Sequence, residues 1–120
     1  MQALAVKAYG EVRNRTADNK SIEHAVFRQI TDALIEAQDL EKTDAPKWAD
    51  AVNRNLELWT LLSTDLLHPD NQLNEATRKS LLELSIFVRR ASMKVLAGEG
   101  EFADLIEINE TIMKGLSGSA

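Results

Sequence analysis

The sequence predicts an all-α, single-domain helical bundle of four main helices plus a short N-terminal helix, and three observations support this fold class. Apolar residues recur at helical spacing over most of the chain, and no stretch alternates apolar and polar residues in the way that marks a strand. A length of 120 residues suits one domain. Turn residues divide the chain into segments whose linkers are short enough to join antiparallel neighbours. We therefore expect one domain over residues 1–120.

The most apolar segment, residues 53–73, is centred on Trp59. Its large side chains form a wide arc at helical spacing, with Leu58 and Leu61 at the flank. The main stripe of this arc contains Trp48, Val52, Leu56, Trp59, Leu62 and Leu66. An arc this wide belongs to a helix with several neighbours, so we expect this helix at the centre of the bundle.

Turn and capping residues predict where this central helix begins and ends. Asp44 is a suitable N-cap, and Pro46 suits the first helical turn. The helix should end near His68, because a residue that precedes a proline, here Pro69, is disfavoured in the α region. Asp70 and the residue after it supply turn chemistry.

The remaining helices follow from similar signals. Residues 1–17 contain a short helix weakened by Gly10, which is either docked on the bundle or mobile until a partner binds. The next helix is capped by Asp18 or Thr16 and runs to about residue 39. A fourth, capped by Asn74 or Asn71, ends at Gly98 and Gly100, and a fifth covers 102 to about 114. We expect the tail at 117–120 to be disordered.

Composition and charge exclude several classes of protein. The net charge of −5 argues against a general affinity for nucleic acid or anionic lipid. The absence of cysteine excludes disulfides and thiolate metal sites and fits a reducing cytoplasm. We see no signal peptide and no apolar run approaching the roughly 20 residues that a membrane span requires. We expect a soluble, cytoplasmic protein.

The charges are nevertheless unevenly distributed. Residues 75–96 hold five bases and two acids, whereas residues 99–110 hold five acids and no base. The first interpretation is that the two segments attract each other within the fold, each exposed pair contributing less than about 1 kcal/mol. The alternative is that the basic helix provides a docking face.

The sequence contains no convincing catalytic, metal or cofactor site. The two histidines, His24 and His68, have no partner at metal-ligand or triad spacing, and no glycine-rich loop could bind phosphate. We expect four large aromatic side chains to be mainly core residues, and Met93 and Met113 to fill gaps or to line an adaptable groove. These four are Trp48, Trp59, Phe87 and Phe102. By elimination, we expect a binding protein without cofactors.

Six fragments resemble the FlaF family of flagellar biosynthesis regulators, in the same order and over nearly the whole chain. They lie at residues 8–9, 23–27, 55–66, 69–73, 86–90 and 105–116. The more specific are N-x-x-L-W-T at 55–60 and I-F-V-R-R at 86–90. The chain departs from the family at residues 18–19, at Asn74, where proline is frequent, and at residues 91–92, where His-Thr commonly follows the arginine pair.

The resemblance implies a flagellin-binding secretion chaperone or regulator that couples flagellin synthesis to export and works opposite FlbT. Helix-in-groove binding suits such a task, and we expect a groove involving the helices at 46–67 and 74–96. The expected contact residues are Trp59, Phe87, Arg89, Arg90, Asn109 and Met113. The alternatives are a regulator acting on flagellin messenger RNA, directly or through FlbT, and a structural adaptor joining FlbT to flagellin.

Overall fold

The computed structural model describes residues 19–40 and 44–116, and these residues form four helices without any strand. The helices are α2 (Asn19–Leu40), α3 (Ala45–Leu67), α4 (Glu75–Leu96) and α5 (Phe102–Leu116). The predicted all-α fold with four main helices is therefore confirmed. The predicted N-terminal helix at 1–17, its neighbouring cap residues and the tail at 117–120 lie outside the described residues. No helix in the described ranges combines the length and apolar character needed to cross a membrane.

The predicted ends of α3 are confirmed. The side chain of Asp44 accepts a hydrogen bond from the backbone nitrogen of Lys47 at 3.3 Å, and Pro46 lies in the first turn. Helix α3 ends at Leu67, and His68 adopts extended backbone with ψ of 136°. This conformation agrees with the steric effect of Pro69 on the residue before it.

Helix α4 is also bounded as predicted. The Asn74 side chain caps it by accepting a hydrogen bond from the backbone nitrogen of Thr77 at 2.8 Å. At the other end, Gly98 has a φ of +81°, a left-handed conformation that glycine adopts without steric cost. The backbone of Gly100 passes so close to Val95 that an added Cβ would lie 2.8 Å from the Val95 nitrogen.

The cap at Asn74 gives a test of this boundary. We expect Asn74→Ala to lower the free energy of unfolding by about 1 kcal/mol, because the amide of Thr77 loses its acceptor. Urea unfolding followed by circular dichroism measures the change. Asn74→Asp keeps an acceptor at this position and should retain most of the stability, so equal losses in the two variants would contradict the assignment.

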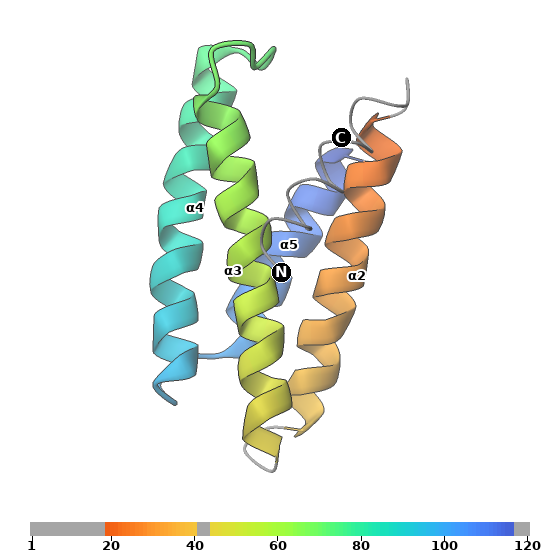
Figure 1. Ribbon diagram of the computed structural model, residues 1–120, viewed down its shortest axis with the longest axis vertical. Coiled ribbons are helices and arrows are strands. Elements are labelled where there is room, and N and C mark those ends of the chain that lie inside the picture. Colours follow the sequence, from red (N-terminus) through yellow and green to blue (C-terminus); the bar gives the residue numbers. More distant parts are fainter. Residues whose placement is uncertain (1–18, 41–43, 117–120) are drawn as a thin grey trace.

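The four helices do not pack on one another equally. Helix α3 packs along both α2 and α4, and α5 packs mainly on α2 and only briefly on α4. Figure 1 shows the reason, because α5 crosses obliquely behind α3, from the end of α4 toward α2. Helices α4 and α5 therefore diverge from the short connection that joins them.

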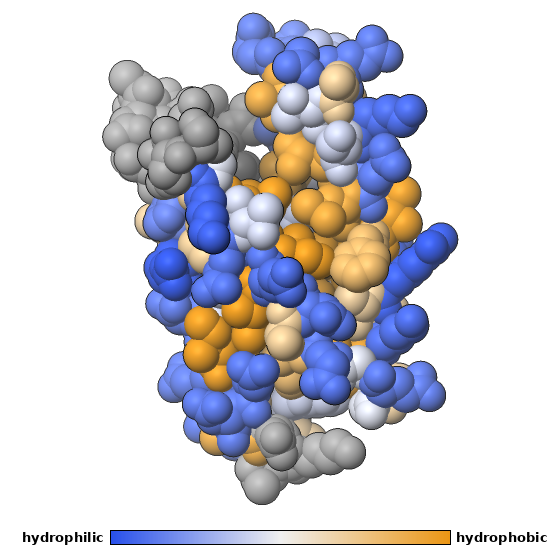
Figure 2. All heavy atoms as spheres, turned by 180° about the vertical axis from the view of Figure 1, so that it is seen from behind, coloured by the Kyte–Doolittle hydropathy of each residue, from blue (hydrophilic) through white to orange (hydrophobic). Residues whose placement is uncertain are grey.

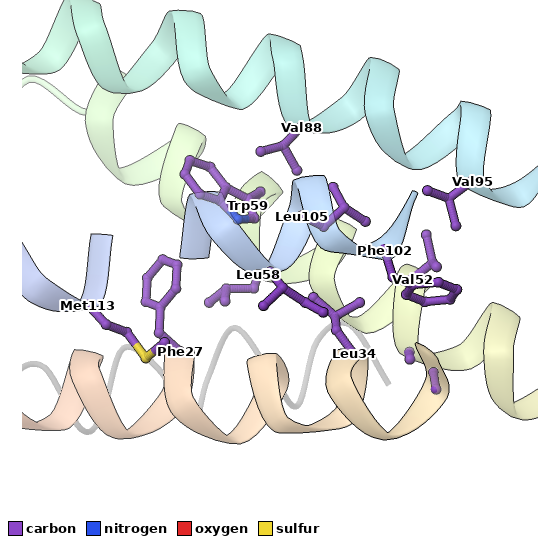
Figure 3. Packing of buried hydrophobic residues seen from close by; sticks show 13 residues of the cluster. Phe27, Leu34, Val52, Leu58, Trp59, Val88, Val95, Phe102, Leu105 and Met113 are labelled. Carbon is purple, nitrogen blue, oxygen red and sulfur yellow. The ribbon is translucent and has the colours of Figure 1, made fainter. Parts of the chain in front are cut away.

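The core lies between all four helices, and Figure 3 shows their side chains pointing into this shared interior. Trp59 is only 1% exposed, which agrees with its predicted central place. Its ring meets the ring of Phe27 from α2 edge to face, with centroids 5.9 Å apart. A second edge-to-face pair, Trp48 and Phe102, joins α3 to α5. Such pairs add about 0.5–1.5 kcal/mol beyond the area that they bury.

Candidate functional site

A groove of about 300 Å³ lies between α4 and α5, and we refer to it as the α4–α5 groove. Apolar side chains from both helices make its floor, and two acids stand on the α5 side. The lining residues are Leu84, Phe87, Asp104, Glu107, Ile108 and Thr111. Figure 2 views the molecule from the side of α5 and shows apolar side chains gathered on this face. The groove thus offers a mainly apolar floor to a partner.

The exposure of Phe87 corrects a prediction, because this ring was expected in the core. Phe87 is 51% exposed, and its neighbour Ile86 is 54% exposed. Helix α4 buries Val88, Ser92 and Val95 against the bundle. Among the other apolar side chains of α4, Leu84, Ala91 and Leu96 are partly buried against the core, whereas Ile86, Phe87 and Met93 are exposed. An exposed phenylalanine beside a groove is a typical interaction site.

The α4–α5 groove shares only one helix, α4, with the groove that the sequence predicted. That groove was expected to involve α3 and α4, but these two helices pack closely along their length. The hydroxyls of Ser63, in the last turns of α3, and Ser85, in the middle of α4, form a hydrogen bond that links the two helices. The opening therefore lies on the other side of α4, where α5 is the neighbour.

Charged residues border the groove on both sides, and they do not pair with each other. Arg90 and Lys94 follow Phe87 by three and seven positions, so they lie on its side of α4. Asp104 and Glu107 line the groove from α5. Among the described residues, no ion pair joins the bases of α4 to the acids of α5. The ion pairs expected between these two segments are thus not formed among the described residues.

The two arginines that were expected to act together lie on different sides of α4. Both are exposed. Arg90 lies one turn from Phe87, whereas Arg89 lies one turn from Ile86 and from Met93. Of the two arginines, only Arg90 is on the Phe87 side of α4, and it lies outside the side chains that line the α4–α5 groove.

Three of the expected contact residues are interior, so their expected contact with a partner does not agree with the closed bundle. Trp59, Asn109 and Met113 are 1%, 0% and 2% exposed. The Trp59 Nε1–H donates to Asn109 Oδ1 at 2.9 Å, and Asn109 Nδ2 donates to Asn55 Oδ1 at 2.8 Å. These bonds hold α5 against α3. The three side chains stabilise the helices that carry the groove, and none of them lines it. Met113 lines a separate hollow between α2 and α5.

The indole determines the orientation of both amides. Because an indole N–H only donates, the oxygen of Asn109 must face Trp59 and its NH₂ must face Asn55. Asn55 then presents its oxygen to Asn109, and its Nδ2 has no hydrogen-bond partner. Sequence reasoning did not single out Asn55, although a polar residue inside the apolar arc of α3 is a signal for such a network.

The other hollows are more polar than the groove. One of about 340 Å³ between α2 and α5 is lined by His24, Arg28, Glu110, Met113 and Lys114. Another, of about 580 Å³, lies where α2 meets the start of α3. Within the described ranges, no three His, Asp or Glu residues gather in a way that could hold a metal ion.

The sequence of this chain matches one known protein family. A family model described as flagellar protein FlaF matches residues 5–116. The chain belongs to the FlaF family. In this FlaF chain, the N-x-x-L-W-T fragment supplies Asn55 and Trp59 to the interior network, and the I-F-V-R-R fragment supplies Phe87 to the groove. Searches among curated proteins and among solved structures find no match.

Proposed function

We propose that this FlaF-family chain binds flagellin as a secretion chaperone or regulator and couples flagellin synthesis to export. The α4–α5 groove is the observation that carries the proposal, since it combines an apolar floor with an exposed phenylalanine. A flagellar role comes from the family. The chain would act in the cytoplasm, before flagellin is exported.

The shape of the groove supports helix-in-groove binding. An amphipathic helix can place its apolar stripe on a floor built by Leu84, Phe87 and Ile108, which come from two neighbouring helices. A flagellin terminus that folds on binding would lose part of its interaction free energy to ordering. Moderate affinity of this kind suits a chaperone that must release its subunit for export.

Phe87 is the residue whose truncation should affect flagellin binding most. We expect Phe87→Ala to weaken binding about 10- to 100-fold, because a largely buried contact of this size contributes about 1.5–3 kcal/mol. Isothermal titration calorimetry with purified flagellin measures the dissociation constant. Size-exclusion chromatography should show the loss of a co-eluting complex.

Ile86→Ala is the matched control for this prediction. Ile86 is the adjacent residue and is equally exposed, at 54%, but it does not line the groove. Binding should therefore change little in this variant. The proposed site is wrong if the two variants weaken binding equally, and the proposed function is wrong if the unmodified protein forms no complex with flagellin.

The exposed bases of α4 favour a second candidate, a regulator acting on flagellin messenger RNA. Lys79, Arg89 and Arg90 are exposed, and basic groups near an exposed aromatic ring are common in RNA-binding proteins. Steep salt dependence of RNA binding would support this candidate. A flagellin complex that persists at high salt would support the chaperone. Co-purification with and without FlbT tests the adaptor role.

A further inference from the structure

We infer that the α4–α5 groove fixes the direction in which a bound amphipathic helix lies, because its two walls carry opposite charges. The inference rests on the proposed function and specifies the flagellin segment by its chemistry. That segment has an apolar stripe with acidic residues along one flank and basic residues along the other. The acidic flank faces α4, and the basic flank faces α5.

The basic wall is the C-terminal half of α4. Arg90 and Lys94 lie on the Phe87 side of the helix, and neither forms an ion pair with another described residue. Glu83 lies one turn before Phe87, so the basic wall does not extend to the N-terminal half. A short connection joins the end of α4 to the beginning of α5. This basic stretch therefore lies near the beginning of α5.

The acidic wall is the first half of α5. Asp104 and Glu107 are exposed and line the groove, and they too form no ion pair with another described residue. The apolar floor separates the two walls. Each wall therefore presents unpaired charge of one sign to whatever lies in the groove.

Opposite walls select direction for a geometric reason. A helix that rests with its apolar stripe on the floor presents one flank to each wall. Turning this helix end for end, with the stripe still on the floor, exchanges the two flanks. Only one direction brings opposite charges together, and the other brings like charges together, which electrostatic complementarity disfavours. A groove with a single sign of charge would not distinguish the two directions.

Single charge reversals test the walls by affinity. We expect Arg90→Glu and Glu107→Lys each to weaken flagellin binding about fivefold at low salt, and less at high salt. Two matched controls carry the same charge change away from the groove. They are Arg89→Glu, on the opposite side of α4, and Glu110→Lys, which lines the hollow between α5 and α2. Binding that changes equally in variants and controls would show a general charge effect and overturn the inference.

A spin label tests direction itself. The chain lacks cysteine, so Ser80→Cys provides a unique attachment point, exposed and two turns before Phe87 on the same side of α4. The label should broaden the NMR signals of only one end of the bound flagellin helix. In the combined Arg90→Glu and Glu107→Lys variant, each wall carries one acid and one base, so neither direction is favoured. The signals of both ends of the bound flagellin helix should then broaden.

The possible outcomes separate this inference from the proposed function. Absence of any flagellin complex with the unmodified protein removes the proposed function, and the inference with it. Binding with both ends broadened in the unmodified protein overturns the inference and leaves the function standing. The same holds if the combined Arg90→Glu and Glu107→Lys variant still binds in a single direction. Circular dichroism of each variant establishes that it is folded.

Discussion

Replacing Trp59 with alanine is expected to lower the free energy of unfolding by about 3–5 kcal/mol. Trp59 is 1% exposed, contacts the ring of Phe27 and donates its indole N–H to Asn109. The substitution therefore leaves a cavity between α2, α3 and α5 and removes one interhelical hydrogen bond. Since small domains are stable by about 5–15 kcal/mol in total, this change should be evident as a large shift in urea midpoint.

Trp59→Phe separates the ring from its N–H group. This variant keeps much of the aromatic contact with Phe27 and loses the hydrogen bond to Asn109. Its cost should lie near 1–3 kcal/mol, roughly that of an unsatisfied buried group together with a smaller cavity. The central role of Trp59 is contradicted if the alanine variant unfolds at nearly the same urea concentration as the unmodified protein.

Asn109→Ala is expected to cost about 2–5 kcal/mol. The substitution removes the acceptor of the Trp59 N–H and the donor to Asn55 Oδ1 at the same time. Both partner groups are buried, and each unsatisfied group costs about 1–3 kcal/mol. Denaturant unfolding again measures the loss. The next residue provides a control, because Glu110 is exposed and its replacement by alanine should change stability by less than about 0.5 kcal/mol.

A double-mutant cycle of Trp59→Phe and Asn109→Ala tests whether these residues act as one network. Residues in one hydrogen-bond network show coupling of about 0.5–3 kcal/mol, so the combined loss should be smaller than the sum of the two single losses. Additive losses would indicate that the hydrogen bond contributes little. Flagellin binding by the folded fraction should be unaffected by Trp59→Phe, since the side chain does not line the groove.

Trp59 is buried and Phe87 is exposed, so only Phe87 belongs to the surface that carries the α4–α5 groove. Both rings are aromatic residues at apolar positions of long helices, and both lie in FlaF-like fragments. In the folded chain, one ring joins three helices and the other borders a groove. The contact set that we propose therefore keeps Phe87 and Arg90 and adds Asp104 and Glu107 from α5.

The sequence by itself determined the four described helices and the ends of α3 and α4. Asp44, Pro69, Asn74 and Gly98 act through their own backbone or the adjacent turn, so their effects can be predicted without knowing where other helices lie. The same holds for the central position of Trp59, because a wide apolar arc requires several neighbours. The residues of one helix and its adjacent turns were sufficient to predict each of these features.

Only the tertiary structure decided which apolar side of α4 remains open. Helical periodicity gives the direction of each side chain around its own helix, but it does not say where the next helix runs. The oblique path of α5 toward α2 leaves Phe87 exposed, and no ion pair among the described residues joins Arg90 to Glu107. Whether oppositely charged segments pair or face a partner depends on this path, because exposed ion pairs contribute too little free energy to redirect a helix that core packing holds in place.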